Sequence, residues 1–236
     1  KRIQELLPRV DIERLFSLSV KHKVLPLLAK HIIDLDIHSQ IKPQFKRIFN
    51  FYLIGNKHRN AKLLEYCYMI VDELRKNGIK AVPLKGSILI PQVYQDLAIR
   101  AMNDLDFLIR TKDRSKTSKI LKEMGFKTGF YDWSTDAIIQ ISYKMELMWK
   151  MHAGNLYPHV MKVDDPYLKF VTLDFSYDVD LQQNYIASNG MWESTVSAEM
   201  LGHQLECLSP IDFLLRLCVH LFKEATNVQW ILAHQD

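Results

Sequence analysis

The sequence predicts an α+β fold in which helices flank a small mixed or antiparallel sheet. Residues 1–78 follow a helical pattern of apolar side chains, the middle of the chain carries several short strand-like runs, and a further helical pattern begins near residue 209. We therefore expect an N-terminal helical region over residues 1–78 that packs on the core, a central α/β core over residues 79–180, and a C-terminal helical region over residues 181–236.

The composition is that of an ordinary globular protein. The chain has 236 residues, of which 48% are hydrophobic and 25% charged, enough for one large domain or two small ones. No apolar run reaches the roughly 18 residues that span a bilayer, and Lys1–Glu5 lack the apolar core of a signal peptide. We expect no membrane partner. Because the sequence starts at Lys1 rather than Met, it does not decide whether a leading segment precedes Lys1.

The cysteines and the net charge limit the cellular compartment and the partners that we expect. Cys67, Cys207 and Cys218 are widely spaced and form no Cys-x-x-Cys motif, which favours buried thiols in a reducing compartment. We therefore expect a cytoplasmic protein. The net charge of +4 permits an anionic substrate but does not indicate nucleic acid.

The N-terminal region is expected to hold three helices. A helical pattern covers residues 11–33, and Pro26 should divide it into two short helices. Pro43 then suits the first turn of a long helix that extends to Lys76, with apolar residues at steps of three and four. Asn77-Gly78 is a suitable C-terminal stop.

The core begins with a short strand over residues 79–84 that leads directly into Lys85-Gly86-Ser87. A glycine at the end of a strand lets backbone N–H groups approach an anion, and Ser87 is expected to cap a helix over residues 88–94. The free N–H groups of a helix N-terminus favour phosphate, and Lys85 adds a positive charge. An ordinary strand-to-helix turn is the alternative for this stretch.

Sixteen residues after Ser87, a second strand begins with two carboxylates, Asp104 and Asp106. Because side chains alternate across a strand, both lie on one face, and the apolar side chains beside them take the other. Their Cβ atoms are expected to be roughly 7 Å apart, a span at which two carboxylates can jointly hold divalent cations. Burying the pair without a cation would be costly. A solvated edge-strand face is the alternative.

Two further charged residues belong to this candidate site. Arg100 lies four residues before Asp104, where it either neutralises the carboxylates or clamps phosphate oxygens with its planar fork. The alternating run at residues 170–178 carries Asp174 on its polar face. If this run forms the antiparallel neighbour of the Asp104–Asp106 strand, Asp174 supplies a third carboxylate. A plain solvated face is again the alternative.

The remaining segments are predicted from their local patterns. They are a helix over residues 111–124, strand-like runs over 126–133, 139–149 and 169–177, a loop over 151–166, a polar connection over 181–202, a helix opened by Ser209-Pro210, and the start of a last helix over 229–236. Because that last pattern stops abruptly, the sequence does not decide whether the domain continues past residue 236.

The central motifs resemble the DNA-polymerase-β-like nucleotidyltransferase superfamily. Leu84-Lys85-Gly86-Ser87 is followed by Arg100-Ala101-Met102-Asn103-Asp104-Leu105-Asp106, which is similar to the Arg-x-Met-x-Asp-x-Asp segment of an uncharacterised bacterial branch. The resemblance extends to Arg59-Asn60 and covers most of the chain, although only the central motif is specific. Two features depart from the pattern: the sixteen-residue gap is longer than is usual in the superfamily, and Phe175-Ser176 stand where the branch often has a histidine.

The resemblance implies a sheet of the polymerase-β type, with residues 79–180 as the catalytic core. It implies transfer of a nucleoside monophosphate from a nucleoside triphosphate, such as ATP, to a hydroxyl-type acceptor, with release of pyrophosphate. The acceptor is expected to be a small molecule rather than a protein or an RNA end, bound between the sheet and the helices beyond residue 205. A catalytically silent nucleotide-binding or regulatory module, such as a toxin–antitoxin partner, and a purely structural helical protein are the alternatives.

The same resemblance assigns roles to the site residues. Two Mg²⁺ or Mn²⁺ ions are the implied cofactors, and the implied catalytic and metal-binding residues are Asp104, Asp106 and Asp174. The implied nucleotide-binding residues are Lys85, Gly86, Ser87 and Arg100.

Overall fold

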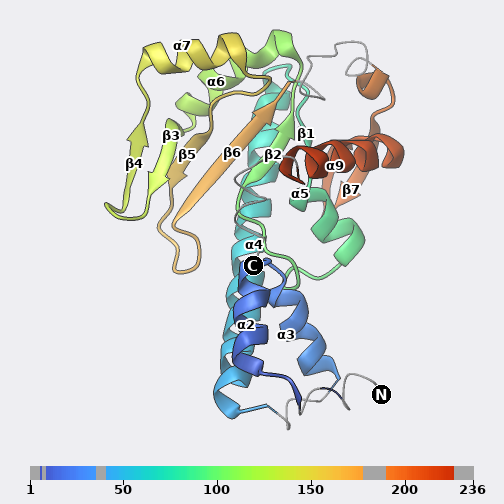
Figure 1. Ribbon diagram of the computed structural model, residues 1–236. Coiled ribbons are helices and arrows are strands. Elements are labelled where there is room, and N and C mark those ends of the chain that lie inside the picture. Colours follow the sequence, from blue (N-terminus) through green and yellow to red (C-terminus); the bar gives the residue numbers. More distant parts are fainter. Residues whose placement is uncertain (1–5, 7–8, 36–40, 178–189, 226–236) are drawn as a thin grey trace.

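The computed structural model describes residues 6, 9–35, 41–177 and 190–225. One long helix, α4 (Pro43–Lys76), runs the length of the molecule, with two short helices beside its N-terminal half and the main sheet beside its C-terminal half (Figure 1). At 34 residues α4 is about 51 Å long. Among the described residues, no helix is both long and apolar enough to cross a bilayer.

The N-terminal helices confirm the prediction from the sequence. They are α2 (Ile12–Lys21) and α3 (Leu25–Asp34), and Asp11 caps α2 by accepting the N–H groups of residues 13 and 14 at 3.0 and 3.1 Å. Pro26 lies in the first turn of α3, so the break falls just before it, where a proline is tolerated. The two helices pack on the start of α4 through Phe45, Phe49 and other apolar side chains.

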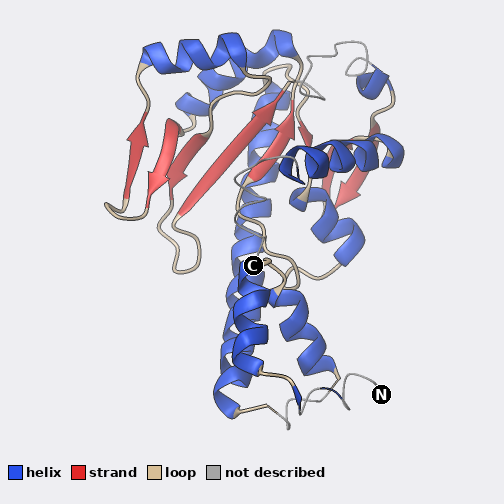
Figure 2. Ribbon diagram, viewed as in Figure 1, coloured by secondary structure: helices blue, strands red, loops and turns tan. Residues whose placement is uncertain are grey.

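The central sheet is mixed and has the strand order β1-β2-β6-β5-β3-β4 (Figure 2). Its strands are β1 (Val82–Pro83), β2 (Leu105–Leu108), β3 (Lys127–Asp132), β4 (Ala137–Gln140), β5 (His159–Lys162) and β6 (Phe170–Ser176). β2 pairs with β6 in parallel, whereas β1 pairs antiparallel with β2 and β5 pairs antiparallel with β6. The predicted α+β class with a mixed sheet is confirmed. The expected antiparallel pairing of the two acidic strands is wrong.

Three local predictions also fail. Helix α7 (Tyr143–His152) replaces most of the strand expected over residues 139–149, and β5 lies inside the loop expected over residues 151–166. A hairpin of β7 (Val196–Met200) and β8 (His203–Cys207) begins inside the expected connection over residues 181–202. Short apolar runs do not distinguish strand from helix, and strand pairing depends on partners that are distant in the sequence.

The two faces of the sheet differ. On one face, apolar side chains of β2 and β6 pack against α4 and α6 (Arg114–Glu123), and the rings of Phe107 and Phe175 stack with centroids 4.7 Å apart. The other face carries Asp106 and Asp174. Over β1 and β2 this second face is covered by a smaller core, made of Val82, Leu84, Leu108, Met191, Trp192, Leu208 and the partly buried Phe213.

The C-terminal helix α9 (Pro210–Ala225) begins as predicted, because Ser209 Oγ accepts the N–H of Asp212 at 3.2 Å. Cys67 and Cys207 are buried free thiols, as expected, but Cys218 is exposed. Helix α9 contacts the smaller core through Phe213, which leaves several of its apolar side chains at the surface, among them Ile211, Leu214, Leu221 and Phe222. The helix expected over residues 229–236 lies outside the described residues.

Candidate functional site

The turn after β1 directs a lysine at the carboxylates. Lys85 has φ +49° and ψ −118°, a conformation that L residues rarely adopt, and it precedes the short helix α5 (Gly86–Leu89), which continues as a π-helical turn (Ile90–Tyr94). The N–H of Leu84 donates to the carbonyl of Asp106 at 2.9 Å, which ties the turn to β2. As a result Lys85 Nζ lies 2.6 Å from Asp106 Oδ1.

Gly86 is needed at this turn because its Cα passes close to another segment. A Cβ at this position would lie 2.8 Å from the sulfur of Met102, closer than real contacts allow. Met102 belongs to the segment that leads into β2, so Gly86 allows the turn and that segment to pack together. A larger residue at position 86 would require the flexible Met102 side chain to shift.

Asp106 is the buried centre of the site. The residue is 6% exposed and its neighbour in register on β6 is Asp174, so the two carboxylates share one face of the sheet. Burial, then the charge of Asp104, raise the pKa of Asp106 to about 7; Lys85 opposes this shift, and Asp174 adds to it. Asp106 thus interacts with two other carboxylates and with one paired lysine, and Arg59 adds a positive charge near Asp104.

Asp104 and Asp174 flank this buried group. Asp104 lies just before β2 and is exposed, so it stands at the rim of the site rather than within the strand. Asp174 is half-buried, and it accepts a hydrogen bond from Asn155 Nδ2 at 3.1 Å. Asn155 was not expected here, because it lies in a predicted loop and no local pattern links it to β6. The structure thus brings the three predicted carboxylates to one face of the sheet.

Two buried asparagines of α4 hold the segment that precedes Asp104. Asn60 Nδ2 donates to the carbonyls of Leu97 and Arg100 at 2.6 and 2.7 Å. Asn56 Nδ2 donates to the carbonyls of Ala98 and Arg100 at 2.6 and 3.1 Å. Beyond the family resemblance, no sequence pattern predicted a role for Asn60, because these contacts join residues about 40 positions apart.

Two arginines lie near this segment. Arg59 donates to Asn103 Oδ1 at 3.0 Å, and burial lowers its pKa while the nearby charges of Tyr52 and Asp104 oppose that shift. The guanidinium of Arg100 lies 5.9 Å from the ring centroid of Tyr94. Within the described part of the chain, no ion pair links Arg100 to a carboxylate and its Nε has no hydrogen-bond partner. Phosphate binding by Arg100 stays a prediction.

Ser87 is placed differently from the expectation. It lies within α5 rather than before it, so it does not cap the helix; the N-cap position is occupied by Lys85, which makes no side-chain cap. Its side chain is 1% exposed and its hydroxyl lies 3.9 Å from the sulfur of Met102. A phosphate contact through this hydroxyl would require the side chain to turn out of the core.

The donor set is of the kind that Mg²⁺ and Mn²⁺ prefer, because both are oxygen-binding cations. In the described ranges, no group of three or more His, Cys, Asp or Glu side chains is gathered closely enough to hold a metal ion. The Lys85 ammonium lies 2.6 Å from Asp106 Oδ1. A metal ion bound by Asp106 through this oxygen would compete with Lys85 for it.

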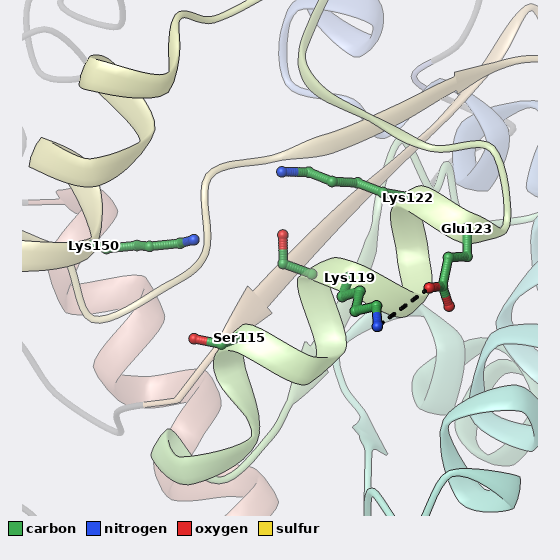
Figure 3. Close-up of a pocket in the computed structure, with 6 residues that line it drawn as sticks. Ser115, Lys119, Lys122, Glu123 and Lys150 are labelled. Carbon is green, nitrogen blue, oxygen red and sulfur yellow. Dashed lines mark ion pairs between the residues drawn. The ribbon is translucent and has the colours of Figure 1, made fainter.

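A separate pocket of about 400 Å³ lies elsewhere, lined by Ser115, Ser118, Lys119, Lys122, Glu123 and Lys150 (Figure 3). Its lysines are paired with acidic side chains, since Lys122 and Lys150 lie 3.1 and 3.0 Å from Glu146 and Lys119 lies 3.8 Å from Glu123. None of the predicted site residues line this pocket.

An α+β fold with a Lys-Gly turn beside carboxylates on two neighbouring strands is that of a nucleotidyltransferase-like protein, as the central motif implies. The chain belongs to the family described as uncharacterised nucleotidyltransferases, whose model matches residues 8–232. No curated protein matches the sequence at a significant level.

Two solved structures are similar to this chain. One is a candidate nucleotidyltransferase from Thermotoga maritima, with 13% identity, a TM-score of 0.43, and coverage of 74% of this chain and 95% of that one. The other is an antigenic nucleotidyltransferase-like protein from Paracoccidioides brasiliensis, with 13% identity, a TM-score of 0.46, and coverage of 74% and 73%.

Proposed function

We propose that the protein is a metal-dependent nucleotidyltransferase that moves a nucleoside monophosphate from a nucleoside triphosphate to a hydroxyl-type acceptor and releases pyrophosphate. The observation that carries this proposal is the buried Asp106, held in register with Asp174 and close to Asp104, with Lys85 as its paired cation. Nucleotidyl transfer depends mainly on positioning and charge neutralisation, which such a site supplies.

Each residue then has a defined task. Asp104, Asp106 and Asp174 would hold Mg²⁺ or Mn²⁺, which when bound lowers the pKa of a hydroxyl and stabilises charge on a phosphoryl group. Asp174 completes the metal site or accepts the acceptor proton.

The turn binds the triphosphate. Lys85 exchanges its bond to Asp106 for one to the triphosphate tail, and the backbone N–H groups of the turn at Gly86 bind that tail. Arg100 supplies a further positive charge for it.

We also propose the cytoplasmic location that the sequence predicts. The buried free thiols of Cys67 and Cys207 support a cytoplasmic location, where thiols stay reduced.

The test uses triphosphates labelled at the α- or the γ-phosphate, incubated with the protein, Mg²⁺ or Mn²⁺, and a cell extract. We expect the α-label alone to enter a product. We expect Asp106→Asn to abolish that product, and Asp72→Asn, which changes an exposed carboxylate of α4, to leave it intact. Nucleotide binding without turnover would instead indicate a silent nucleotide-binding module. Absence of metal-dependent nucleotide binding would contradict both functions.

A further inference from the structure

Three aromatic side chains gather at the surface of the sheet. The rings of Tyr131 and Phe170 stack with centroids 4.2 Å apart, and the ring of Trp133 lies edge-on to both, at 5.2 and 5.3 Å. Trp133 is 72% exposed, and Tyr131 and Phe170 are half-buried. We call these three residues the aromatic platform. A contiguous apolar patch at a protein surface often marks a binding site.

The platform lies on the same face of the sheet as the carboxylates. Side chains alternate along β6, and its residues are alternately half-buried and buried, so Phe170 shares a face with Asp174. Four residues separate them, which corresponds to about 13 Å along the strand. Figure 1 shows β6 as the strand between β2 and β5, so one strand joins the platform to the acidic site.

The platform is held in place by a polar network. The hydroxyl of Tyr131 donates to Asp136, and Lys162 Nζ donates to the same carboxylate at 2.7 Å. Lys162 is the partner of Phe170 in the β5–β6 register, so its side chain leaves the sheet on the platform side. Lys169, next to Phe170, is exposed. The Tyr131 ring is therefore positioned before a ligand arrives. The border of the platform carries the exposed Lys169 and an ion pair between Lys162 and Asp136.

The position of the lysine turn defines the side from which an acceptor can approach. Lys85 lies after β1, on one side of the carboxylates, and the platform is built from β6 and the β3–β4 hairpin, on the other side. In phosphoryl transfer the attacking and leaving oxygens are roughly in line. If pyrophosphate leaves toward Lys85, the acceptor arrives over β6. Part of the space expected for it, under α9, is filled by the smaller apolar core.

We propose that the aromatic platform stacks a base of a single-stranded nucleic acid whose terminal hydroxyl is the acceptor. This inference rests on the proposed function, and it differs from the small-molecule acceptor expected from the sequence. Every base offers a π-face to aromatic rings, and a positive charge beside such rings, here the exposed Lys169, attracts the phosphate backbone. A separation of about 13 Å is close to four steps of a stacked strand at about 3.4 Å per nucleotide, so a single nucleotide does not span it.

The test measures binding of fluorescein-labelled hexaadenylate, as RNA and as DNA, to the full chain without metal. We expect Trp133→Ala to weaken binding of at least one strand by about fivefold or more, the effect of losing one stacked base. Trp133→Phe should restore most of the affinity. The matched control is Phe51→Ala, since Phe51 on α4 is also 72% exposed, and it should bind like the unmodified chain. The hexaadenylate that binds more tightly, RNA or DNA, identifies which nucleic acid supplies the base.

Three results would overturn the proposal. One is that neither strand binds, or that Trp133→Ala binds as well as the unmodified chain. Another is that adenosine monophosphate binds as tightly as hexaadenylate and loses affinity equally, because a strand is then not required. The third is that Trp133→Ala weakens binding of ATP with Mg²⁺ as much as that of the strand, because the platform then serves the donor.

Failure of the proposed function gives a different result. If no nucleotidyl transfer is found, but strand binding still depends on Trp133 in both the unmodified chain and Asp106→Asn, only the catalytic assignment is wrong. If metal-dependent transfer is found but Trp133→Ala leaves strand binding unchanged, only the platform is misassigned.

Discussion

The two faces of the central sheet bury titratable side chains with different results. On the helix-covered face, His159 is 1% exposed and its Nε2 lies 3.0 Å from Ser118 Oγ. Burial, and then the neighbouring Lys122, lower its pKa to about 4, so it is a neutral packing residue. The other face carries Asp106 and Asp174, and we call it the open face. There, burial and Asp104 raise the pKa of Asp106 to about 7.

The difference shows what each face is built for. Burial disfavours the charged form on both faces. On the helix-covered face the imidazole of His159 meets a neutral hydroxyl through Nε2, whereas in the described part of the chain its Nδ1 has no hydrogen-bond partner. The charges near it are divided between two lysines and one carboxylate, Lys122, Lys150 and Glu146. On the open face three carboxylates interact with one another and with one lysine. This arrangement costs stability, so it is useful only if a cation binds there.

The largest expected effect comes from removing the central charge of the open face. Asp106→Asn should lower nucleotidyl transfer by about 1000-fold or more, equivalent to about 4 kcal/mol of transition-state stabilisation. Because a buried carboxylate among like charges is removed, the melting temperature should not fall. His159→Gln should retain transfer per folded molecule. Radiolabel transfer and thermal unfolding measure both, and equal loss of activity in the two variants would erase the contrast between the faces.

The pH dependence of stability should reveal His159. The pKa of His159 is about 4 in the folded protein and has its ordinary value of 6.5 in the unfolded chain. The unfolded chain therefore takes up the proton first as the pH falls. The free energy of unfolding should therefore decrease between about pH 6.5 and 4, by up to about 3 kcal/mol.

The measurement is best made in an Asp106→Asn background. The pKa of Asp106 is raised, so this group takes up its proton first in the folded protein and opposes the effect of His159 over the same pH range. Urea unfolding across this range should show the slope in Asp106→Asn and its loss in Asp106→Asn with His159→Gln. Parallel curves for the two proteins would contradict the assignment.

A smaller effect is expected where α4 holds the open face. Asn60→Ala leaves the partly buried carbonyls of Leu97 and Arg100 without this donor, which should cost about 1–3 kcal/mol and lower transfer by shifting the segment before Asp104. Asn50→Ala, at an exposed position of the same helix, should change neither property. Unchanged stability of Asn60→Ala would mean that the remaining contacts from Asn56 are sufficient.

The smallest expected effect concerns Lys85. Lys85→Ala should weaken nucleoside triphosphate binding by about tenfold, equivalent to about 1.4 kcal/mol, and leave Mg²⁺ or Mn²⁺ binding no weaker, because its ammonium competes for Asp106. Lys122→Ala, which breaks a lysine–carboxylate pair away from the open face, is the matched control. Calorimetric titration with metal alone and with nucleotide separates the two effects; loss of metal affinity alone would show that Lys85 has another role.

Local patterns were sufficient for part of the fold. The long helix ending near Asn77-Gly78, the two helices around Pro26, the strand at residues 170–176 and the helix after Ser209 all follow from periodicity and caps. Helix α7 and strand β5 did not follow, since each depends on where its apolar side chains can pack. Asn60 and Asn155 contact the site from distant segments, so no local signal marked them.

The sequence alone determined that two carboxylates share a strand face, that a Lys-Gly turn precedes them, and that a third carboxylate stands on another alternating strand, because alternation and turn chemistry are local properties of the chain. Only the tertiary structure decided that β2 and β6 are parallel neighbours with Asp106 beside Asp174, that Ser87 turns into the core, and that aromatic rings lie on the carboxylate side of β6. Strand partners and the faces that they bury are set by packing between distant segments.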